Sequence, residues 1–283
     1  MGKLVSKIIV PINNLKETSW LTILLFSILY CVYVTLINLV VFKSNIIQPI
    51  SELTLGLVNQ TLIVNVVSLI LFVFILIIKY GRLTFFDIGL KGNRLLSAVT
   101  AVSIIWIAMQ LINIVIGIII LGKPIIYEGW NQYGASKMFG SFIGQLFGNS
   151  LFEEIVFRGF LLVQICKKLK SKKGQLLSGI CVSQFLFALI HIPNRILGGM
   201  NIFEIVTSLI ILFMIGIFFA IVYLLTDNLF FVIGIHTIWN TPLLVFNGLP
   251  SILVIFVATI FLLLIWGSTF GSLSLKATNQ SIR

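Results

Sequence analysis

Residues 151–160 read LFEEIVFRGF, which places two adjacent carboxylates, Glu153 and Glu154, and one guanidinium, Arg158, inside a stretch that is otherwise apolar. The apolar sequence continues on both sides, from Met138 to Cys166, and is long enough to cross a bilayer as a helix. Ionisable side chains at membrane depth are costly, and they usually mark a functional site. Three of them within six positions therefore indicate a site rather than ordinary packing.

The composition predicts a polytopic membrane protein. Of the 283 residues, 59% are hydrophobic and 10% are charged, whereas soluble domains carry about 25% charged residues. No long polar linker divides the chain, so we expect an all-α transmembrane bundle in which residues 1–283 form a single membrane domain. The net charge of +11 suggests an anionic partner. However, most basic residues lie in short loops, where they orient helices and meet lipid headgroups, so the expected partner is the lipid bilayer and not nucleic acid.

Eight apolar runs qualify as membrane spans by length. They are approximately Trp20–Phe42, Leu57–Ile78, Leu96–Leu121, Met138–Cys166, Gln175–Ile192, Ile202–Leu225, Leu229–Phe246 and Ser251–Phe270. The fifth and seventh runs are short, so tilted or partly re-entrant segments are the alternative there. The polar residues Gln110 and Asn113 in the third run are expected to hydrogen-bond neighbouring helices.

The distribution of basic residues predicts the orientation. With the N-terminus inside, the inner segments hold 14 Lys and Arg residues, the outer loops hold 4, and Arg158 completes the total of 19. Both termini are therefore expected in the cytoplasm. The longest outer loop, Gly122–Lys137, carries Tyr127, Trp130 and Tyr133, which are expected to anchor it at the membrane interface. The Ile-, Asn- and Lys-rich composition is typical of a low-GC bacterium, so we expect a multi-pass protein of a bacterial plasma membrane.

Helical geometry divides the charged residues into a pair and a single carboxylate. Glu154 and Arg158 are four positions apart and lie on one face, so they can form an ion pair. Glu153 is rotated from them by about 100° and has no cation of its own helix opposite it. A buried carboxylate of this kind suits a general base, which takes a proton from water.

The chain has only two histidines, His191 and His236, and both lie in apolar runs. Phe187 precedes His191 by one helical turn and can pack against its ring. Asn240 follows His236 by one turn, so both can face one cavity. We predict that Glu153, His191, His236 and Asn240 converge around one water-sized space within the membrane.

These residue types suit the activation of a water molecule. Glu153 would accept the proton of the water, and a histidine or Asn240 would donate a hydrogen bond to the oxyanion that develops. The sequence contains none of the HExxH, GxSG or GxGD protease motifs. A zinc ion held by Glu153, His191 and His236 is the alternative, with water as the fourth ligand.

Three motifs carry a family resemblance: EExxxR at 153–158, FxxxH at 187–191 and HxxxN at 236–240. In this order they resemble the CAAX-protease and bacteriocin-processing (CPBP) family, also called the Abi family of intramembrane proteases, which includes the type II CAAX prenyl endopeptidases. The ordered set covers Gly140 to Pro242, so residues 140–242 are the expected catalytic core.

The resemblance implies hydrolysis of a peptide bond in a membrane-embedded or lipid-anchored peptide or protein substrate. By motif position, the first glutamate, Glu153, activates water, and His191, His236 and Asn240 hold the water and the oxyanion. Glu154 and Arg158 support the site. Both a metal-dependent and a metal-free glutamate mechanism are argued for this family. We expect no cofactor, because Asn240 is a poor zinc ligand and a good oxyanion donor.

Two other functions are compatible with the same residues. One is a proton-coupled transporter in which the carboxylate and histidines relay protons, although the paired broken helices of such proteins are not evident. The other is a non-catalytic immunity or scaffold protein. Bacterial relatives of the resembled family act in bacteriocin processing, self-immunity or peptide signalling, so the resemblance extends to such roles.

Overall fold

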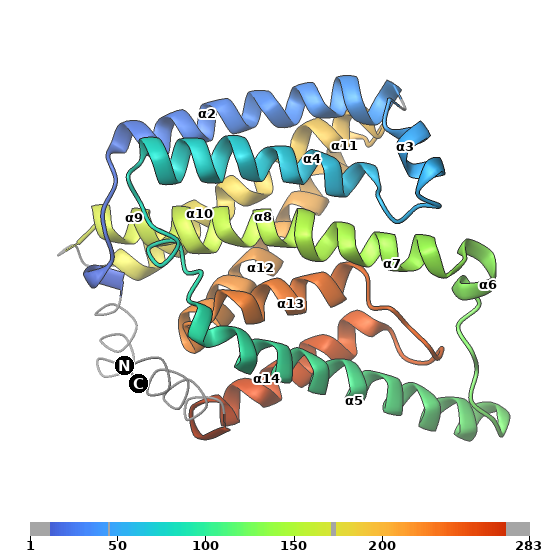
Figure 1. Ribbon diagram of the computed structural model, residues 1–283. Coiled ribbons are helices and arrows are strands. Elements are labelled where there is room, and N and C mark those ends of the chain that lie inside the picture. Colours follow the sequence, from blue (N-terminus) through green and yellow to red (C-terminus); the bar gives the residue numbers. More distant parts are fainter. Residues whose placement is uncertain (1–11, 45, 171–173, 270–283) are drawn as a thin grey trace, which may run out of the picture. The chain divides into compact units, whose positions relative to one another are not determined.

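The computed structural model describes residues 12–44, 46–170 and 174–269, with the backbone alone at 267–269. Within these residues the regular structure is helical, apart from one isolated bridge between Ile126 and Phe246 (Figure 1). The predicted all-α class is therefore confirmed. Contacts between Cα atoms divide the chain into two compact units. Unit 1 comprises Met1–Gln48, Val64–Leu90 and Phe152–Leu229, and unit 2 comprises Pro49–Ile63, Lys91–Leu151 and Phe230–Arg283.

The α-helices follow one another with short connections. They are α2 (Trp20–Ile37), α3 (Gln48–Leu53), α4 (Gln60–Ser68), α5 (Leu95–Leu121), α6 (Gly129–Tyr133), α7 (Ala135–Gly144), α8 (Ser150–Glu154), α9 (Val163–Lys168), α10 (Gln175–Leu189), α11 (Ile192–Leu197), α12 (Ile202–Thr226), α13 (Leu229–Asn240) and α14 (Ser251–Thr269). Wider π-helical segments extend α2 to Phe42 and α4 to Tyr80. Two more, Gln145–Asn149 and Ile155–Leu162, connect α7, α8 and α9.

Among the described residues, five helical stretches are long and apolar enough to cross a membrane. They are Trp20–Phe42, Gln60–Tyr80, Gly92–Leu121, Gln175–Leu197 and Ile202–Thr226, and they correspond to five of the eight predicted runs. Two further apolar helices, Leu229–Asn240 and Ser251–Trp266, are shorter. The remaining run is helical from Ala135 to Lys168, but its polar and charged residues reduce its apolar character.

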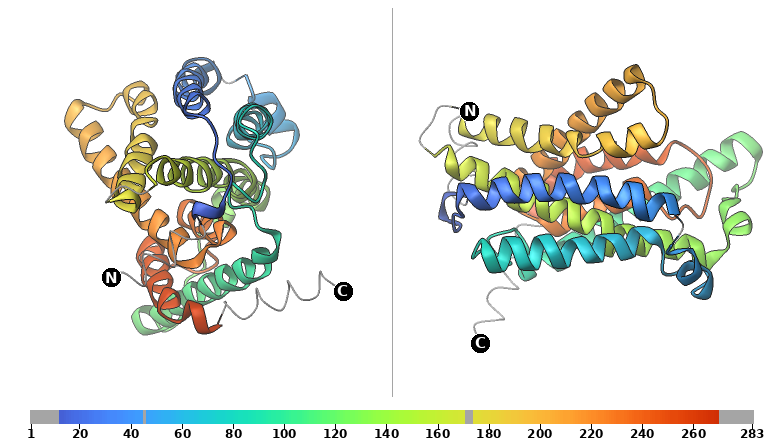
Figure 2. Two further views of the ribbon diagram at one scale, coloured as in Figure 1. Left: turned by 90° about the vertical axis from the view of Figure 1, so that its left-hand side faces the viewer. Right: turned by 90° about the horizontal axis from the view of Figure 1, so that it is seen from above.

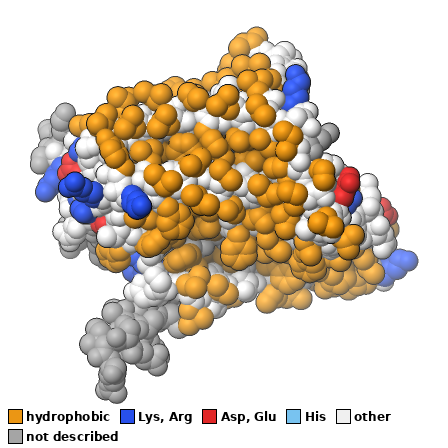
Figure 3. Space-filling view, turned by 45° about the horizontal axis from the view of Figure 1, so that its top comes forward, with side chains coloured by type: hydrophobic (Ala, Val, Ile, Leu, Met, Phe, Trp, Pro, Cys, Tyr) orange, Lys and Arg blue, Asp and Glu red, His pale blue; other side chains and the backbone are white. Residues whose placement is uncertain are grey.

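Apolar side chains on the outer faces of the helices are exposed. On α2, for example, Leu21, Leu24 and Ile28 are each more than half exposed. Hydrophobic side chains cover most of the face shown in Figure 3. Exposed apolar surface of this extent marks a region that contacts something other than water, and a lipid bilayer matches the length of the helices.

An aromatic cluster holds the charged helix in unit 1. Phe26 and Tyr30 of α2 meet Phe72, Phe152 and Phe160, with ring centroids between 5.1 and 5.8 Å apart in the pairs Phe26–Phe72, Phe26–Phe160, Tyr30–Phe72 and Tyr30–Phe152. All five side chains are buried. Such pairs contribute about 0.5–1.5 kcal/mol each beyond the burial of their area. Because Phe152 immediately precedes Glu153, this cluster fixes the position of the carboxylate.

Gly159 allows a close approach on the same helix. A Cβ at this position would lie 2.1 Å from the carbonyl oxygen of Ile88, a distance that no real side chain tolerates. The turn at residues 84–90 therefore packs directly on the helical backbone, one residue after Arg158.

Segments predicted on the cytoplasmic side contact one another within unit 1. The Gln164 side chain accepts a hydrogen bond from the Thr18 amide at 2.9 Å and donates one to the Lys16 carbonyl at 3.0 Å. The Lys167 ammonium donates to the Asn13 carbonyl at 2.9 Å. These contacts are those expected if the two segments lie at the same membrane surface.

The prediction of one helix over Leu229–Phe246 is wrong in its second half. α13 ends at Asn240, and residues 241–250 are irregular. Pro242 explains the end, because proline disfavours helical geometry at the residue before it. The run is mostly apolar and its length approaches that of a span, so its composition alone did not reveal the change, although Pro242 is part of it.

Side chains of α5 satisfy the backbone of this irregular segment within unit 2. Gln110 accepts a hydrogen bond from the amide of Val245 at 3.0 Å, and Asn113 donates to the carbonyl of Phe246 at 2.9 Å. The sequence predicted that these two residues hydrogen-bond neighbouring helices. In the structure they instead bind the backbone of an irregular segment. Backbone polar groups outside a helix need such partners when water does not reach them.

Helix α6 and the loop before it also bind this irregular segment. The Trp130 indole donates to the carbonyl of Leu244 at 2.6 Å, and the amide of Tyr127 donates to the carbonyl of Val245 at 2.9 Å. Trp130 thus has a defined partner in the protein, in addition to any contact with lipid. The hydrogen bonds therefore join two segments that were both predicted to lie on the outer side, the loop after α5 and the segment after α13.

Candidate active site

Glu154 and Arg158 form the predicted ion pair in the core of unit 1. Arg158 Nη1 lies 2.9 Å from Glu154 Oε1, and both side chains are fully buried. The guanidinium also lies over the Phe187 ring, 4.5 Å from its centroid, and its Nη2 is 3.5 Å from the Gly216 carbonyl. The pair therefore braces the helix from inside and links it to α10 and α12, which pack against each other (Figures 1 and 2).

Glu153, the carboxylate beside this pair, approaches His191. Its side chain is 8% exposed. The distance from Glu153 Oε1 to His191 Nε2 is 3.9 Å, which is longer than a direct hydrogen bond and is in the range that one bridging water spans. Two motif residues that are distant in sequence, one from α8 and one from the turn between α10 and α11, are thus brought together in one unit.

The tautomer of His191 follows from its other nitrogen. Nδ1 lies 2.8 Å from the Phe187 carbonyl oxygen, and a carbonyl only accepts hydrogen bonds, so Nδ1 carries the hydrogen. In the neutral ring, Nε2 then presents a lone pair towards Glu153. The Phe187 ring meets the imidazole edge to face, with centroids 5.0 Å apart, so the predicted packing of Phe187 on His191 is confirmed.

His236 and Asn240 lie on α13 in unit 2. His236 is buried, with 5% exposure, whereas Asn240 is exposed at the end of the helix. The Asn240 carboxamide donates from Nδ2 to Gln145 Oε1 at 3.0 Å. This bond orients the carboxamide and leaves the second Nδ2 hydrogen for another acceptor.

Gln145 is a polar site residue that the sequence reasoning missed. It lies in the first π-helical segment after α7, and Ser150 Oγ also lies 3.5 Å from its Oε1. The available signal was a carboxamide in the apolar run that leads to Glu153.

The predicted convergence of all four residues stays a prediction. Glu153 and His191 belong to unit 1, and His236 and Asn240 belong to unit 2. Glu153 and His191 lie close together within unit 1, and His236 and Asn240 lie one turn apart on α13 within unit 2.

A zinc site needs three protein ligands of the kinds found here. Unit 1 supplies two suitable donors, Glu153 Oε1 and His191 Nε2, which face each other. Among the described residues, no three or more His, Cys, Asp and Glu side chains are placed together to hold a metal. Zinc would therefore require His236 to join the other two residues.

The comparison with family models matches residues 135–242 to the family described as type II CAAX prenyl endopeptidase Rce1-like. The match includes all three motifs and Gln145. Neither the comparison with curated proteins nor the comparison with solved structures finds a match.

Proposed function

We propose that this chain is an intramembrane endopeptidase with a peptide or protein substrate. The reason is that residues 135–242 carry a domain of the Rce1-like type II CAAX prenyl endopeptidase family. The observation that carries the proposal is the approach of Glu153 Oε1 to His191 Nε2 at 3.9 Å. The two groups are the expected proton acceptors for a single water.

The tautomer of His191 supports this role. A water between the two groups donates one hydrogen to the Glu153 carboxylate and the other to the Nε2 lone pair, which directs an oxygen lone pair outwards. That oxygen attacks the substrate carbonyl while Glu153 takes the proton, and Glu153 then returns the proton to the leaving amine. General-base assistance of this kind typically contributes about 10²–10⁴ in rate.

His236 and Asn240 are proposed to stabilise the oxyanion. A donor aimed at the developing charge is worth about 10²–10³ in rate. The hydrogen bond from Asn240 to Gln145 supports this role, because it fixes the carboxamide before substrate arrives. Glu154 and Arg158 are proposed to position Glu153 without contacting substrate.

We propose that the reaction proceeds without a metal. A carboxamide suits an oxyanion and is a weak zinc ligand beside imidazole, so the metal-free mechanism gives Asn240 a role that zinc coordination does not. Zinc held by Glu153, His191 and His236 is the alternative, in which the ion would supply Lewis-acid activation of the water.

The proposed setting is a multi-pass membrane protein with both termini in the cytoplasm. Five helices of spanning length support this setting. The contacts of the N-terminal segment with Gln164 and Lys167 support the expected sidedness, because they join segments predicted for the same surface.

A comparison of membrane peptides tests the proposal. Cells that produce the wild type, Glu153→Gln or Glu128→Gln are compared by mass spectrometry, and Glu128 serves as an exposed control. The wild type and Glu128→Gln should yield cleavage fragments that Glu153→Gln lacks at equal protein level. Identical fragment sets in all three, together with Glu153-dependent proton flux in proteoliposomes, would favour a transporter.

A further inference from the structure

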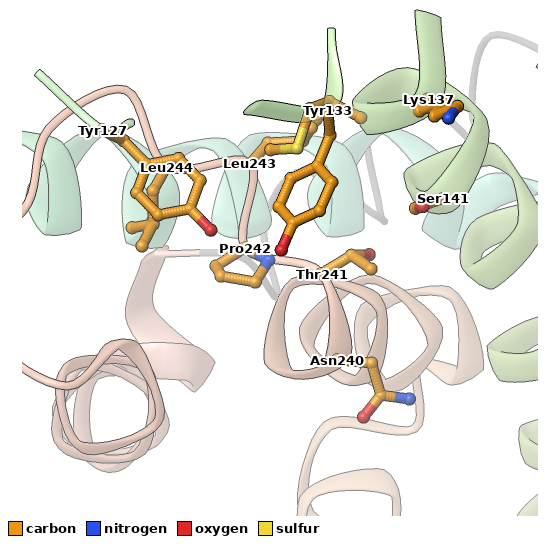
Figure 4. A pocket seen from close by; sticks show the side chains of 10 residues that line it. Tyr127, Tyr133, Lys137, Ser141, Asn240, Thr241, Pro242, Leu243 and Leu244 are labelled. Atoms are coloured by element: carbon orange, nitrogen blue, oxygen red, sulfur yellow. The ribbon is translucent and has the colours of Figure 1, made fainter. Parts of the chain in front are cut away.

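A cavity in unit 2 lies beside Asn240, the candidate oxyanion donor. It has a volume of about 370 Å³, within the range of sites that hold small ligands. Its walls come from α6 and the loop before it, from α7 and from the turn after α13. Asn240, the last residue of α13, borders it (Figure 4).

The polar side chains on its wall all have a hydrogen-bond donor, and the Lys137 ammonium is a donor only. The hydroxyl groups of Tyr127 and Tyr133 point towards the turn at Thr241 and Pro242 (Figure 4). Lys137 and Ser141 also line the space, and they are one helical turn apart on α7. Lys137 is the single charged side chain among the ten lining residues.

The stem of Lys137 is held in place by a glycine. A Cβ at Gly56 would lie 2.5 Å from Lys137 Cγ, and Gly56 has a φ of +85°, which favours glycine. The stem therefore packs against bare backbone. This contact limits the loss of side-chain freedom when the ammonium binds an anion.

We propose that this cavity is a subsite for a carboxylate of the peptide substrate, bound by the ammonium of Lys137 and the hydroxyl group of Ser141, which lies one turn further along α7. The proposal rests on the proposed function, because it assigns the cavity to the substrate of the same site. A single ammonium with one neighbouring hydroxyl group matches a monoanion with two oxygens. Headgroup-binding surfaces instead gather about four to eight basic residues, so a peptide carboxylate is the favoured occupant.

Two sources of this carboxylate are distinguished by three peptide pools. Dye-labelled hexapeptides without acidic side chains carry a free C-terminus in one pool and an amidated C-terminus in the second. The third pool is amidated and carries one glutamate. Binding to the full chain in nanodiscs of phosphatidylcholine is measured by fluorescence anisotropy, so the test does not depend on cleavage.

The wild type should bind a carboxylate pool about tenfold more tightly than the amidated neutral pool, the lower end for a hydrogen bond to a charged group. Lys137→Met should abolish this preference, and Lys137→Arg should retain it. Lys123→Met is the matched control, since Lys123 is an exposed lysine between α5 and α6 that does not line the cavity.

Equal binding of all three pools by the wild type overturns the subsite. Displacement of the carboxylate pool by short-chain phosphatidylglycerol, at concentrations where acetate has no effect, overturns it in favour of a lipid headgroup. Neither outcome changes the Glu153-dependent fragments expected from the cellular comparison, so failure of the subsite and failure of the proposed function are separate results.

Discussion

Removing one member of the Glu154–Arg158 pair should destabilise the protein far more than removing both. Both side chains are fully buried and joined at 2.9 Å. In Glu154→Leu the guanidinium stays buried and loses its ion-pair partner. The Gly216 carbonyl at 3.5 Å, two aromatic rings and the charge of Glu153 remain near it. Leaving one charge of a buried pair uncompensated costs about 3–5 kcal/mol, whereas replacing both by apolar groups is often neutral.

These free energies correspond to large shifts of the melting temperature. About 1 kcal/mol moves Tm by roughly 2–4 °C in proteins of about 150–250 residues. Glu154→Leu and Arg158→Met should therefore each lower Tm by roughly 6–20 °C. The double variant should recover most of the loss. Thermal unfolding of the four proteins in one detergent, followed by size-exclusion fluorescence, measures the double-mutant cycle.

An exposed ion pair provides the control. Lys168 and Glu17 are 2.6 Å apart, but the Glu17 side chain is 45% exposed, so solvent screens their attraction and Glu17→Leu should shift Tm only slightly. Additive losses in the double variant, or single-variant shifts no larger than that of Glu17→Leu, would refute the reasoning about the buried pair.

Further predictions concern packing, pH and metal. Gly159→Ala should lower Tm by several degrees, because its Cβ would lie 2.1 Å from the Ile88 carbonyl; an unchanged Tm would contradict the close approach. Although burial disfavours the charge of Asp87, hydrogen bonds from Thr84 and a backbone amide hold its pKa below the ordinary value of 3.8. Its stabilising effect over Asp87→Asn should therefore be complete at neutral pH and disappear as the pH falls below 3.8 through the lowered pKa; a Tm difference that does not change with pH would argue against this role. Treatment with a chelator should leave peptidase activity intact, whereas one tightly held zinc per chain, with activity lost on its removal and restored on its return, would establish the metal alternative.

Helical periodicity was sufficient to predict the local geometry of the charged helix. The spacing of four residues between Glu154 and Arg158 predicted their pair, and the same spacing predicted the contact of Phe187 with His191. Both contacts follow from neighbouring positions on a helix, so no tertiary information was needed.

Two features that the sequence did not predict, the end of α13 and the role of Gln145, depend on tertiary contacts. The end of α13 at Asn240 depends on Pro242 and on the hydrogen bonds that the following segment makes with α5. The mostly apolar composition of residues 229–246 resembles that of one longer helix. The role of Gln145 likewise depends on Asn240, which is 95 positions away.

The sequence allowed a prediction of the class of reaction, but it did not allow a prediction of the substrate. The ordered motifs indicated a protease family, and the match over residues 135–242 supports it. Substrate choice depends on cavities such as the one beside Asn240, whose walls come from three separate segments. No spacing rule relates those segments, so their meeting required the structure.

The activity of purified Glu153→Gln, measured on a peptide identified by the cellular comparison, tests the central claim most directly. The substitution keeps the size of the side chain and removes its ability to accept the proton of the water. We expect kcat/KM to fall by about 10²–10⁴, the usual contribution of a general base, with Tm close to that of the wild type. A folded Glu153→Gln protein that retains kcat/KM within about twofold of the wild type, far less than general-base loss implies, would contradict the assignment of Glu153 as the base.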